Sequence, residues 1–396
     1  MINNLKFFIQ IILLTPLIFL ILILSPIFRV RIGKIKSNLI GHMTTPMEIF
    51  IGEKKIGLHP KNEIVLWYLQ DGQITNKFLY KSLNKELLIL PGIILFPLHI
   101  FFSKFRLTEK FVYYKVIETQ KDRKKKFLGD KQIDDNDIFI NSKSYINFSK
   151  KEIEYGDNFL KKNFIEKNQK FVCFASRSKN FKDESINSLR NGSIRSQILG
   201  INYLLDNKYK AVRMGRKEQE KMKDVNNNIF DYSFSNEIDD FLDIYIISKC
   251  KFMICTQHGL NEVATAMRVP KLVVNFWFWC DLYANHLSPI IVPKKIFSIK
   301  EKKLLNYVEI FKRGLDSNST TESLGCNYES IDNNENEILD ATKEMYNLVE
   351  FNNLDLKYQF NNQLDFWNKF KNYFGYLPKN TIISPSFFKQ NEDLFC

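Results

Sequence analysis

The turn at His258 and Gly259 has the features of a phosphate-binding site. Glycine lets the backbone turn sharply or approach a ligand closely, and the helix predicted over 261–268 begins at this turn. The first N–H groups and the positive dipole end of a helix stabilise an anion. Glu262, one turn into the helix, could hold both hydroxyls of a ribose, although it could equally be a residue that only complements the dipole.

Three arginines lie at or just after predicted strand ends in the second half of the chain. Arg177 ends one strand, Arg190 follows in a loop, and Arg213 closes a further strand with Gly215 after it. At strand ends their charge-assisted contacts to a diphosphate would be strong, but each could instead pair with a nearby acid. Lys294 lies in a predicted loop that could close over the same ligand.

His42 is the candidate for proton transfer. It follows Gly41 in a predicted loop after the first predicted strand, and a strand-like run over 47–51 comes next. Because free imidazole titrates near neutral pH, a histidine there could take the proton from an attacking hydroxyl. A structural histidine held by hydrogen bonds is the competing interpretation. His59, before Pro60, has no comparable surroundings.

The stretch 239–276 positions the turn at His258. Its apolar residues recur at helical spacing over 241–250 and form strand-length runs over 251–255 and 271–276. Helix, strand, turn, helix and strand in this order make one α/β repeat. Because ligands of open parallel sheets bind at the carboxyl ends of the strands, we expect the turn to face a ligand.

The alternation of strand and helix patterns predicts two Rossmann-like domains. The N-terminal half shows this alternation between residues 62 and 90. A polar helical stretch near 149–167 separates the halves, and a buried strand opens the second one. We therefore expect an N-terminal domain over 29–165 and a nucleotide-binding domain with closing C-terminal helices over 166–396.

A membrane span is predicted over 7–28. These residues carry no charge and would measure about 33 Å as a helix, enough for a hydrocarbon core of roughly 30 Å. Basic residues follow directly: Arg29, Arg31, Lys34 and Lys36. By the positive-inside rule they place the rest of the chain in the cytoplasm, at the inner membrane. A cleaved signal peptide and a helix buried against its own domain are the alternatives.

Three further segments allow more than one interpretation. Residues 91–102 are apolar but too short to span, and they fit either a helix or hairpin in the membrane interface or a core helix. The basic run 121–126 fits a solvated loop better than a contact to lipid headgroups. Asp135 and Asp137 have the D-x-D spacing of metal-dependent transferases but lie in a polar run, and we therefore expect no obligatory metal.

Composition limits the class of protein. The 396-residue chain has 57 Lys and Arg against 44 Asp and Glu, a net charge of +13, which favours polyanionic neighbours such as nucleotide diphosphates or anionic lipid. No P-loop, nucleophile elbow or nucleic-acid motif is present, and we expect no nucleic-acid partner. The six cysteines show no metal-ligand spacing, which indicates reduced thiols in the cytosol.

The residues around the turn resemble those of known families. The donor-binding half of GT-B glycosyltransferases and of nucleotide-sugar 2-epimerases is similar to the run containing Thr256, Gly259, Leu260, Glu262, Val269 and Pro270. Those families have a Gly-Gly or Ser-Gly pair where this chain has His258-Gly259.

A second resemblance extends from about Arg29 to the C-terminus. It rests on R-I-G-x-I followed by G-H and Glu48, on V-C-F-x-x-R, R-N and V-R-M-G, and on the closing run 381–391. These motifs are similar to a bacterial glycosyltransferase family of the surface-polysaccharide type, and more distantly to GDP-fucose-using protein fucosyltransferases. In the fucosyltransferases the first arginine, here Arg177, meets the nucleotide phosphates.

These resemblances imply an α/β, GT-B-like fold with two Rossmann-like domains facing a cleft, to which the apolar segment 7–28 adds an N-terminal transmembrane helix. We therefore expect a glycosyltransferase that moves a sugar, without a metal or cofactor, from a nucleotide-sugar donor to a cell-surface glycan or lipid-linked acceptor at the membrane. The expected donor contacts are Arg177, Arg190, Arg213, Gly215, His258, Gly259, Glu262 and Lys294, with His42 as the base. A nucleotide-sugar 2-epimerase and a non-catalytic membrane-tethered scaffold are the alternatives.

Overall fold

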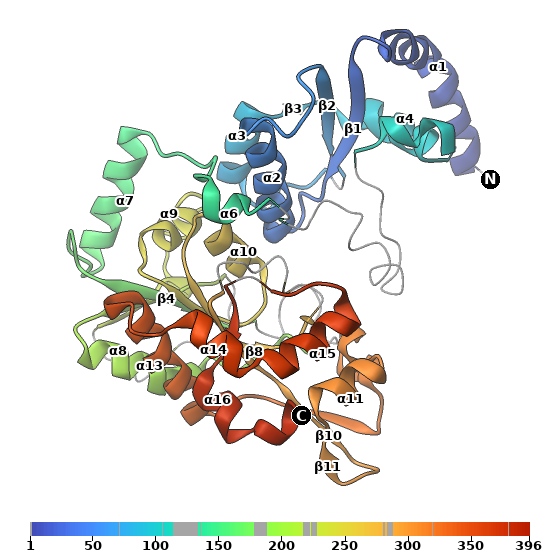
Figure 1. Cartoon of the computed structure of the whole chain (residues 1–396). Coiled ribbons are helices and arrows are strands. Elements are labelled where there is room, and N and C mark those ends of the chain that lie inside the picture. Colours follow the sequence, from blue (N-terminus) through green and yellow to red (C-terminus); the bar gives the residue numbers. More distant parts are fainter. Residues whose placement is uncertain are drawn as a thin grey trace. The chain divides into compact units, whose positions relative to one another are not determined.

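The computed structural model of the chain forms two compact units, Met1–Asn147 and Phe148–Cys396 (Figure 1). The structure describes residues 2–70, 72–104, 106–113, 134, 136–177, 188–216, 222, 228–279, 282, 288–318, 320–378 and 380–396. The domain boundary predicted after residue 165 moves to residue 147, because the helix over 150–162 packs within the second unit. There, Tyr245 donates a hydrogen bond to Asp157 at 2.6 Å.

The first unit contains a three-stranded parallel sheet in the order β1-β2-β3. Its elements are α1 Ile2–Leu24, β1 Arg29–Ile35, α2 Ile40–Lys55, β2 Glu63–Leu69, α3 Lys77–Glu86, β3 Leu88–Ile89, α4 Gly92–Lys104, the 3-10 helix η1 Arg106–Phe111 and α6 Ile138–Asn141. Helices α2 and α3 connect successive strands and pack together, while α4 packs on β1 and β2. This is the α/β alternation that the sequence predicted.

Helix α2 corrects one prediction. The sequence predicted Gly41 and His42 in a loop and a strand over 47–51, but a single helix covers 40–55. Every residue from 43 to 53 is buried. A helix buried on all sides lacks the period of 3.6 residues that identifies a helix in a sequence. His42 therefore lies in the first turn of a helix, which still begins after the carboxyl end of β1.

The R-I-G motif of the first unit has a structural role. A Cβ on Gly33 would lie 2.6 Å from the ring of Trp67, so glycine makes room for this buried tryptophan on the neighbouring strand. Arg31 donates hydrogen bonds to Glu63 and to the Val112 carbonyl, each at 3.2 Å. These contacts hold β1 to β2 and to the end of η1.

Among the described helices, α1 alone is long and apolar enough to cross a membrane, with a mean hydropathy of 2.9 over Phe7–Leu24. Only 11% of that segment is buried. The buried part is a stripe at helical spacing, including Leu14, Ile18 and Ile21, that packs against α4 and the sheet. Figure 1 shows α4 alongside α1. The segment predicted over 91–102 is thus a helix that contributes one face to this core.

The second unit is built on a larger sheet. Its first elements are α7 Lys150–Lys162, β4 Phe171–Ala175, η2 Arg195–Gln197, α8 Ile198–Asp206, β5 Lys210–Arg213, β6 Ile229–Asp231, η3 Tyr232–Phe234, α9 Leu242–Lys249, β7 Met253–Cys255, α10 Gly259–Ala266 and β8 Lys271–Phe276. The remaining ones are β9 Ile290–Pro293, β10 Lys295–Ser298, β11 Lys303–Leu304, α11 Tyr307–Lys312, η5 Leu315–Ser317, α12 Thr321–Leu324, β12 Tyr328–Ile331, α13 Glu335–Phe351, α14 Leu356–Asn362, α15 Leu364–Phe374, β13 Ile382–Ile383, α16 Pro385–Gln390 and η6 Glu392–Leu394.

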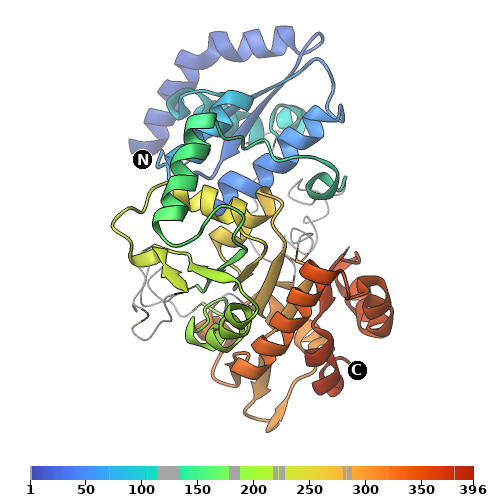
Figure 2. The same ribbon diagram turned by 90° about the vertical axis from the view of Figure 1, so that its left-hand side faces the viewer.

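Seven parallel strands follow the order β13-β9-β8-β7-β4-β5-β6. The chain starts in the middle with β4, adds β5 and β6 on one side, and then returns to place β7, β8 and β9 on the other side. Helices α8 and α13 pack together on one face of the sheet, and α9 packs with α10 on the other (Figures 1 and 2). The direction of strand addition therefore reverses between β4 and β7, which makes this point the topological switch point.

The repeat predicted over 239–276 is confirmed as α9, β7, α10 and β8, with the turn at His258 between β7 and α10. The predicted loop at Lys294 shrinks to that one residue, because β9 ends at Pro293 and β10 begins at Lys295. The α/β class with parallel sheets is confirmed in both units.

Candidate functional site

The loops after β4 and β7 meet at the switch point of the second unit. Arg177 lies two positions beyond β4, and Thr256 directly follows β7. The backbone N–H of Arg177 donates to the Thr256 hydroxyl at 2.8 Å, which joins the two loops. Open parallel sheets bind their ligands in the crevice at such a point. The geometry therefore places Arg177 where a ligand of this sheet is expected.

The loop that carries Arg190 is folded onto the same edge. The Ser176 hydroxyl donates to the Gly192 carbonyl at 2.8 Å, and the Gly192 N–H donates to the Arg177 carbonyl at 3.3 Å. A Cβ on Gly192 would come within 2.7 Å of the Asn275 amide, so this close approach requires glycine. These contacts bring Arg190 near Arg177, although the two residues lie on different loops.

The two guanidinium groups make this edge strongly cationic. Burial, and then the charge of Arg190, lower the pKa of Arg177 to about 10. Burial, Arg177 and Arg190 also lower the pKa of His258 to about 3, so its imidazole is neutral at physiological pH. Both shifts are ones that a bound anion would oppose, because a negative charge stabilises the protonated form of each group.

His258 also caps helix α10. Its Nδ1 accepts a hydrogen bond from the Leu260 N–H at 3.1 Å, which satisfies one of the donors at the start of the helix. Gly259 is the first residue of the helix and is half-buried. The neutral imidazole thus replaces the Ser, Asn or Asp usual at this position. It adds no negative charge that would repel an anion.

Glu262 is held by residues that the sequence analysis missed. The Asn261 side-chain amide donates to Glu262 Oε1 at 3.1 Å, and Lys271 Nζ donates to Asn261 Oδ1 at 2.6 Å. Lys271 also donates to the Thr265 hydroxyl and is fully buried, which lowers its pKa. In the sequence, Lys271 is a single lysine at the start of the apolar run 271–276, and the run by itself indicates only a strand.

Two of the predicted donor contacts have partners inside the second unit. Arg213 is 2% exposed and pairs with Asp231 at 3.1 Å, on the side of β4 away from β7. Lys294 is 3% exposed, donates to the Asn191 carbonyl at 2.8 Å and pairs with Asp332. Lys294 therefore stabilises the loop that carries Arg190 through the neighbouring residue Asn191. Gly215 follows β5 with a φ of 140°, in the region that favours glycine.

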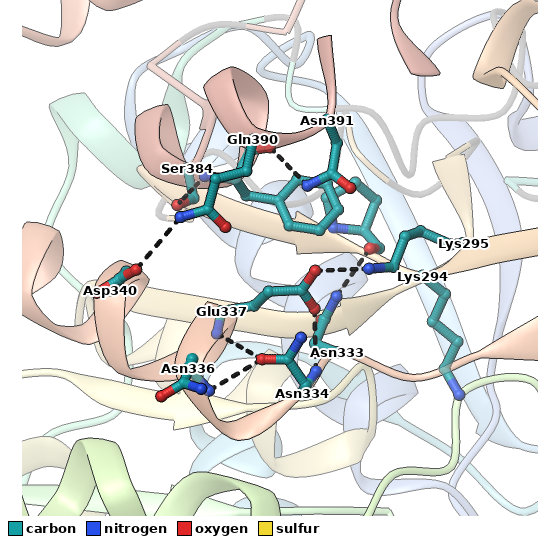
Figure 3. Close-up of polar contacts among 12 residues, drawn as sticks. Lys294, Lys295, Asn333, Asn334, Asn336, Glu337, Asp340, Ser384, Gln390 and Asn391 are labelled. Atoms are coloured by element: carbon teal, nitrogen blue, oxygen red, sulfur yellow. Dashed lines mark hydrogen bonds and ion pairs between the residues drawn. The ribbon is translucent and has the colours of Figure 1, made fainter. Parts of the chain in front are cut away.

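Figure 3 shows how the two neighbouring lysines differ. Lys295 turns toward Glu337 in the first turn of α13 and pairs with it at 2.5 Å, whereas Lys294 points away from that pair. Glu337 also completes the capping box of α13 by accepting from the Asn334 N–H at 2.9 Å. Lys295 thus stabilises the start of α13, whereas Lys294 binds the carbonyl of Asn191 in the loop that carries Arg190.

In the first unit, His42 lies in the opening turn of α2 and is half-buried. This turn follows β1 at the carboxyl edge of the three-stranded sheet. Glu48, the later acid of the motif, is buried and accepts from the Ser144 hydroxyl at 2.6 Å and the Tyr145 N–H at 3.0 Å. Glu48 therefore anchors the segment around Tyr145. The role of His42 as the base stays a prediction.

His59 has surroundings that the sequence did not reveal. Its imidazole contacts Glu53 at 3.1 Å and Glu63 at 2.5 Å, and all three side chains are nearly excluded from solvent. Burial raises the pKa of Glu63, but hydrogen bonds from His59 and the charge of Arg31 outweigh it and hold this pKa below its usual range. This cluster ties the end of α2 to β2.

The described residues contain no group of three or more His, Cys, Asp or Glu that could hold a metal ion. The first aspartate of the D-x-D motif, Asp135, lies outside the described residues. The basic run 121–126 also lies outside them. The Asn136 amide donates to Glu53 at 2.9 Å, and Asp137 precedes α6.

Comparison with known proteins adds distant structural similarities. No protein-family model and no curated protein matches this sequence. The chain is similar to E. coli ADP-heptose LPS heptosyltransferase II, with 14% identity and a TM-score of 0.35 over 61% of this chain and 84% of that one. It is similar to the glycosyl transferase family 9 structure from Veillonella parvula, with 13% identity and a TM-score of 0.37 over 62% and 80%.

A third similarity is to S. aureus MnaA, determined with UDP, with 12% identity and a TM-score of 0.34 over 62% of this chain and 79% of that one. Similarities at this level do not assign an activity to this chain. The resemblance to protein fucosyltransferases stays a prediction.

Proposed function

We propose that the protein is a membrane-anchored, metal-independent glycosyltransferase of the GT-B type. It transfers a sugar from a nucleotide-sugar donor to a cell-surface glycan or lipid-linked acceptor. One observation carries this proposal: Arg177, Arg190 and His258 gather at the switch point of the parallel sheet in the second unit. A cationic crevice at this point suits the diphosphate of a nucleotide sugar.

The second unit would bind the donor and stabilise its departure. When the bond between the anomeric carbon and the diphosphate breaks, negative charge grows on the diphosphate oxygens. Arg177, Arg190 and the N–H groups at Gly259 supply fixed positive charge for it. Glu262 would accept hydrogen bonds from the ribose hydroxyls, with its carboxylate oriented by Asn261.

The first unit would activate the acceptor. His42 takes the proton of the acceptor hydroxyl as its oxygen attacks the anomeric carbon, so that a glycosidic bond forms and the nucleoside diphosphate leaves. The proton then passes from the imidazole to water. In this scheme His42 contributes to turnover and makes no contact with the donor nucleotide.

Helix α1 would anchor the enzyme in the inner membrane, with both units in the cytoplasm. The supporting observations are the apolar surface of α1 and the basic residues that follow it. An anchor is useful to a transferase whose acceptor is attached to lipid, because both then diffuse in the same two-dimensional layer.

The test is an assay of the full chain in detergent with a panel of radiolabelled nucleotide sugars. We expect slow release of free sugar from one donor without any acceptor, because transferases commonly use water as a poor acceptor. An isomerised nucleotide sugar would identify a 2-epimerase. No conversion and no binding of any nucleotide sugar would identify a scaffold and overturn the proposal.

A further inference from the structure

The first unit contains a cavity of about 600 Å³ at the carboxyl ends of β2 and β3. Its lining includes Leu69, Gln70, Tyr80, Leu90, Ile93 and Phe96. No charged side chain lines it among the described residues. Its volume falls within the usual range for ligand pockets, about 300–1,000 Å³. The lining chemistry favours an apolar ligand over a sugar nucleotide.

Helix α4 connects this cavity to the candidate membrane helix. Ile93 and Phe96 line the cavity and are 74% and 47% exposed. The opposite side of α4, with Leu95 and Leu98, packs on α1. Near its far end, Lys104 Nζ lies 4.8 Å from the ring centre of Phe7. Because α1 is the candidate membrane helix and packs on α4, a bilayer that holds α1 would bring lipid close to the mouth of the cavity.

The cavity also shares an edge of the sheet with the predicted base. The three strands are parallel, so their carboxyl ends lie at one edge, where α2 and its His42 begin. The Gln70 N–H donates to the Ile35 carbonyl at 2.9 Å, and the Thr75 N–H donates to the Ser37 carbonyl at 3.0 Å. These bonds fix the cavity wall to the end of β1.

We propose that this cavity binds the hydrocarbon chain of a lipid-linked acceptor. The chain enters from the bilayer at Ile93 and Phe96, and the polar head of the lipid stays at the edge of the sheet that carries His42. This inference rests on the proposed function, because it names the class of acceptor. It adds that the first unit selects its acceptor by the lipid part as well as by the sugar.

The test measures binding of farnesyl phosphate to the full chain in detergent micelles, with farnesol and inorganic phosphate as separate ligands. We expect farnesyl phosphate and farnesol to bind and inorganic phosphate to bind much more weakly. Ile93→Glu should weaken both apolar ligands about tenfold or more, because it places a charge at the mouth of an apolar cavity. Ile93→Trp should also weaken them by filling the mouth without a charge.

The matched control is Ile94→Glu, on the same helix but outside the cavity lining. It makes the same substitution on a neighbouring exposed position of α4 and should leave farnesol binding unchanged. Equal losses in Ile93→Glu and Ile94→Glu, or inorganic phosphate binding as tightly as farnesyl phosphate, would overturn the proposal. Release of sugar from the donor without acceptor should persist in all three variants. If the native chain does not release sugar, the proposed function fails, whereas failure of the lipid binding alone removes only the cavity assignment.

Discussion

The carboxyl edges of the two parallel sheets differ in chemistry. In the second unit this edge carries Arg177 and Arg190, with a neutral His258 beside them. In the first unit it carries an apolar cavity and His42. The same strand and helix alternation therefore presents a cationic edge in one unit and an apolar cavity beside an imidazole in the other. The loops and helices that follow the strands, and not the sheets, make the difference.

The cations of the second unit show a related contrast. Arg213 and Lys294 lie at strand ends but pair with Asp231 and Asp332 in buried positions. Arg177 lies instead at the switch point between β4 and β7, where burial and then the charge of Arg190 lower its pKa. Position at a strand end is therefore not sufficient to identify a ligand contact. The position of the strand end relative to the switch point separates Arg213 and Lys294 from the candidate binding residues.

The contrast between the edges is tested most strongly at His42. We expect His42→Ala to lower the rate of sugar transfer on the order of 10³-fold, because it removes the general base. Donor affinity should stay the same, since the donor belongs to the second unit. Measuring kcat with the acceptor and the donor Kd by calorimetry separates these effects. Full turnover in the variant would remove His42 from the mechanism.

The converse test is Arg177→Ala. Loss of a charge-assisted contact to the diphosphate should weaken binding of the nucleoside diphosphate about 100-fold. The same variant should leave the thermal midpoint near its native value or raise it, since Arg177 and Arg190 repel each other. Calorimetric titration with ADP, GDP and UDP measures the affinity, and a thermal scan measures the midpoint.

Arg195→Ala is the control for that experiment. Arg195 is exposed on η2 in the same unit, so its removal changes the net charge equally. The nucleotide affinity of this variant should stay within about twofold of native, the effect expected for a solvent-screened charge. Comparable losses in the two variants would mean that net charge, rather than a built site, attracts the nucleotide.

The sequence was sufficient for the elements around the turn. The apolar runs before and after His258 have the lengths of strands and are bounded by breakers, so α9, β7, α10 and β8 could be predicted. Helix α2 could not, because burial on all sides removes its amphipathic period. Similarly, a lone lysine at the start of an apolar run gave no indication that Lys271 holds Asn261.

The site itself was partly within reach of sequence reasoning. Position at or near a strand end selected Arg177 and Arg190 as candidates, but it also selected Arg213 and Lys294. The acidic partners of Arg213 and Lys294 are remote in sequence, so the sequence did not reveal these ion pairs. The folding of the 188–192 loop onto Thr256 and Asn275 depends on tertiary packing at Gly192. The cavity of the first unit arises from packing of α4 and was likewise invisible.

The neutral state of His258 predicts a pH effect on stability. Its pKa is about 3 in the fold and near 6.5 in the unfolded chain. Between these two pKa values the unfolded chain binds a proton at His258 and the folded chain does not. The free energy of unfolding is therefore highest above pH 6.5 and falls as the pH drops toward 3. At pH 5 this costs about 2 kcal/mol.

Urea unfolding of the native protein and of His258→Asn at pH 7.5 and pH 5 measures this cost. Asparagine can cap the helix but does not titrate. The variant should therefore lose less stability than the native protein between the two pH values. Equal losses would mean that His258 is protonated in the fold, and that the cationic edge has a third positive charge.

The smallest expected effect concerns the orientation of Glu262. Asn261→Ala removes the amide that donates to Glu262 and should weaken nucleotide binding about fivefold, or about 1 kcal/mol, because Asn261 acts only through the orientation of Glu262 and its loss has the net value of one ordinary hydrogen bond. Glu262→Ala should weaken it more, with little change in thermal midpoint. Because Glu262 is proposed to hold the ribose hydroxyls, both losses should largely disappear when the ligand is the corresponding 2′,3′-dideoxy nucleotide. A loss that persists with the dideoxy nucleotide would assign Asn261 to the support of buried Lys271 alone, and the cationic edge would then recognise only the diphosphate.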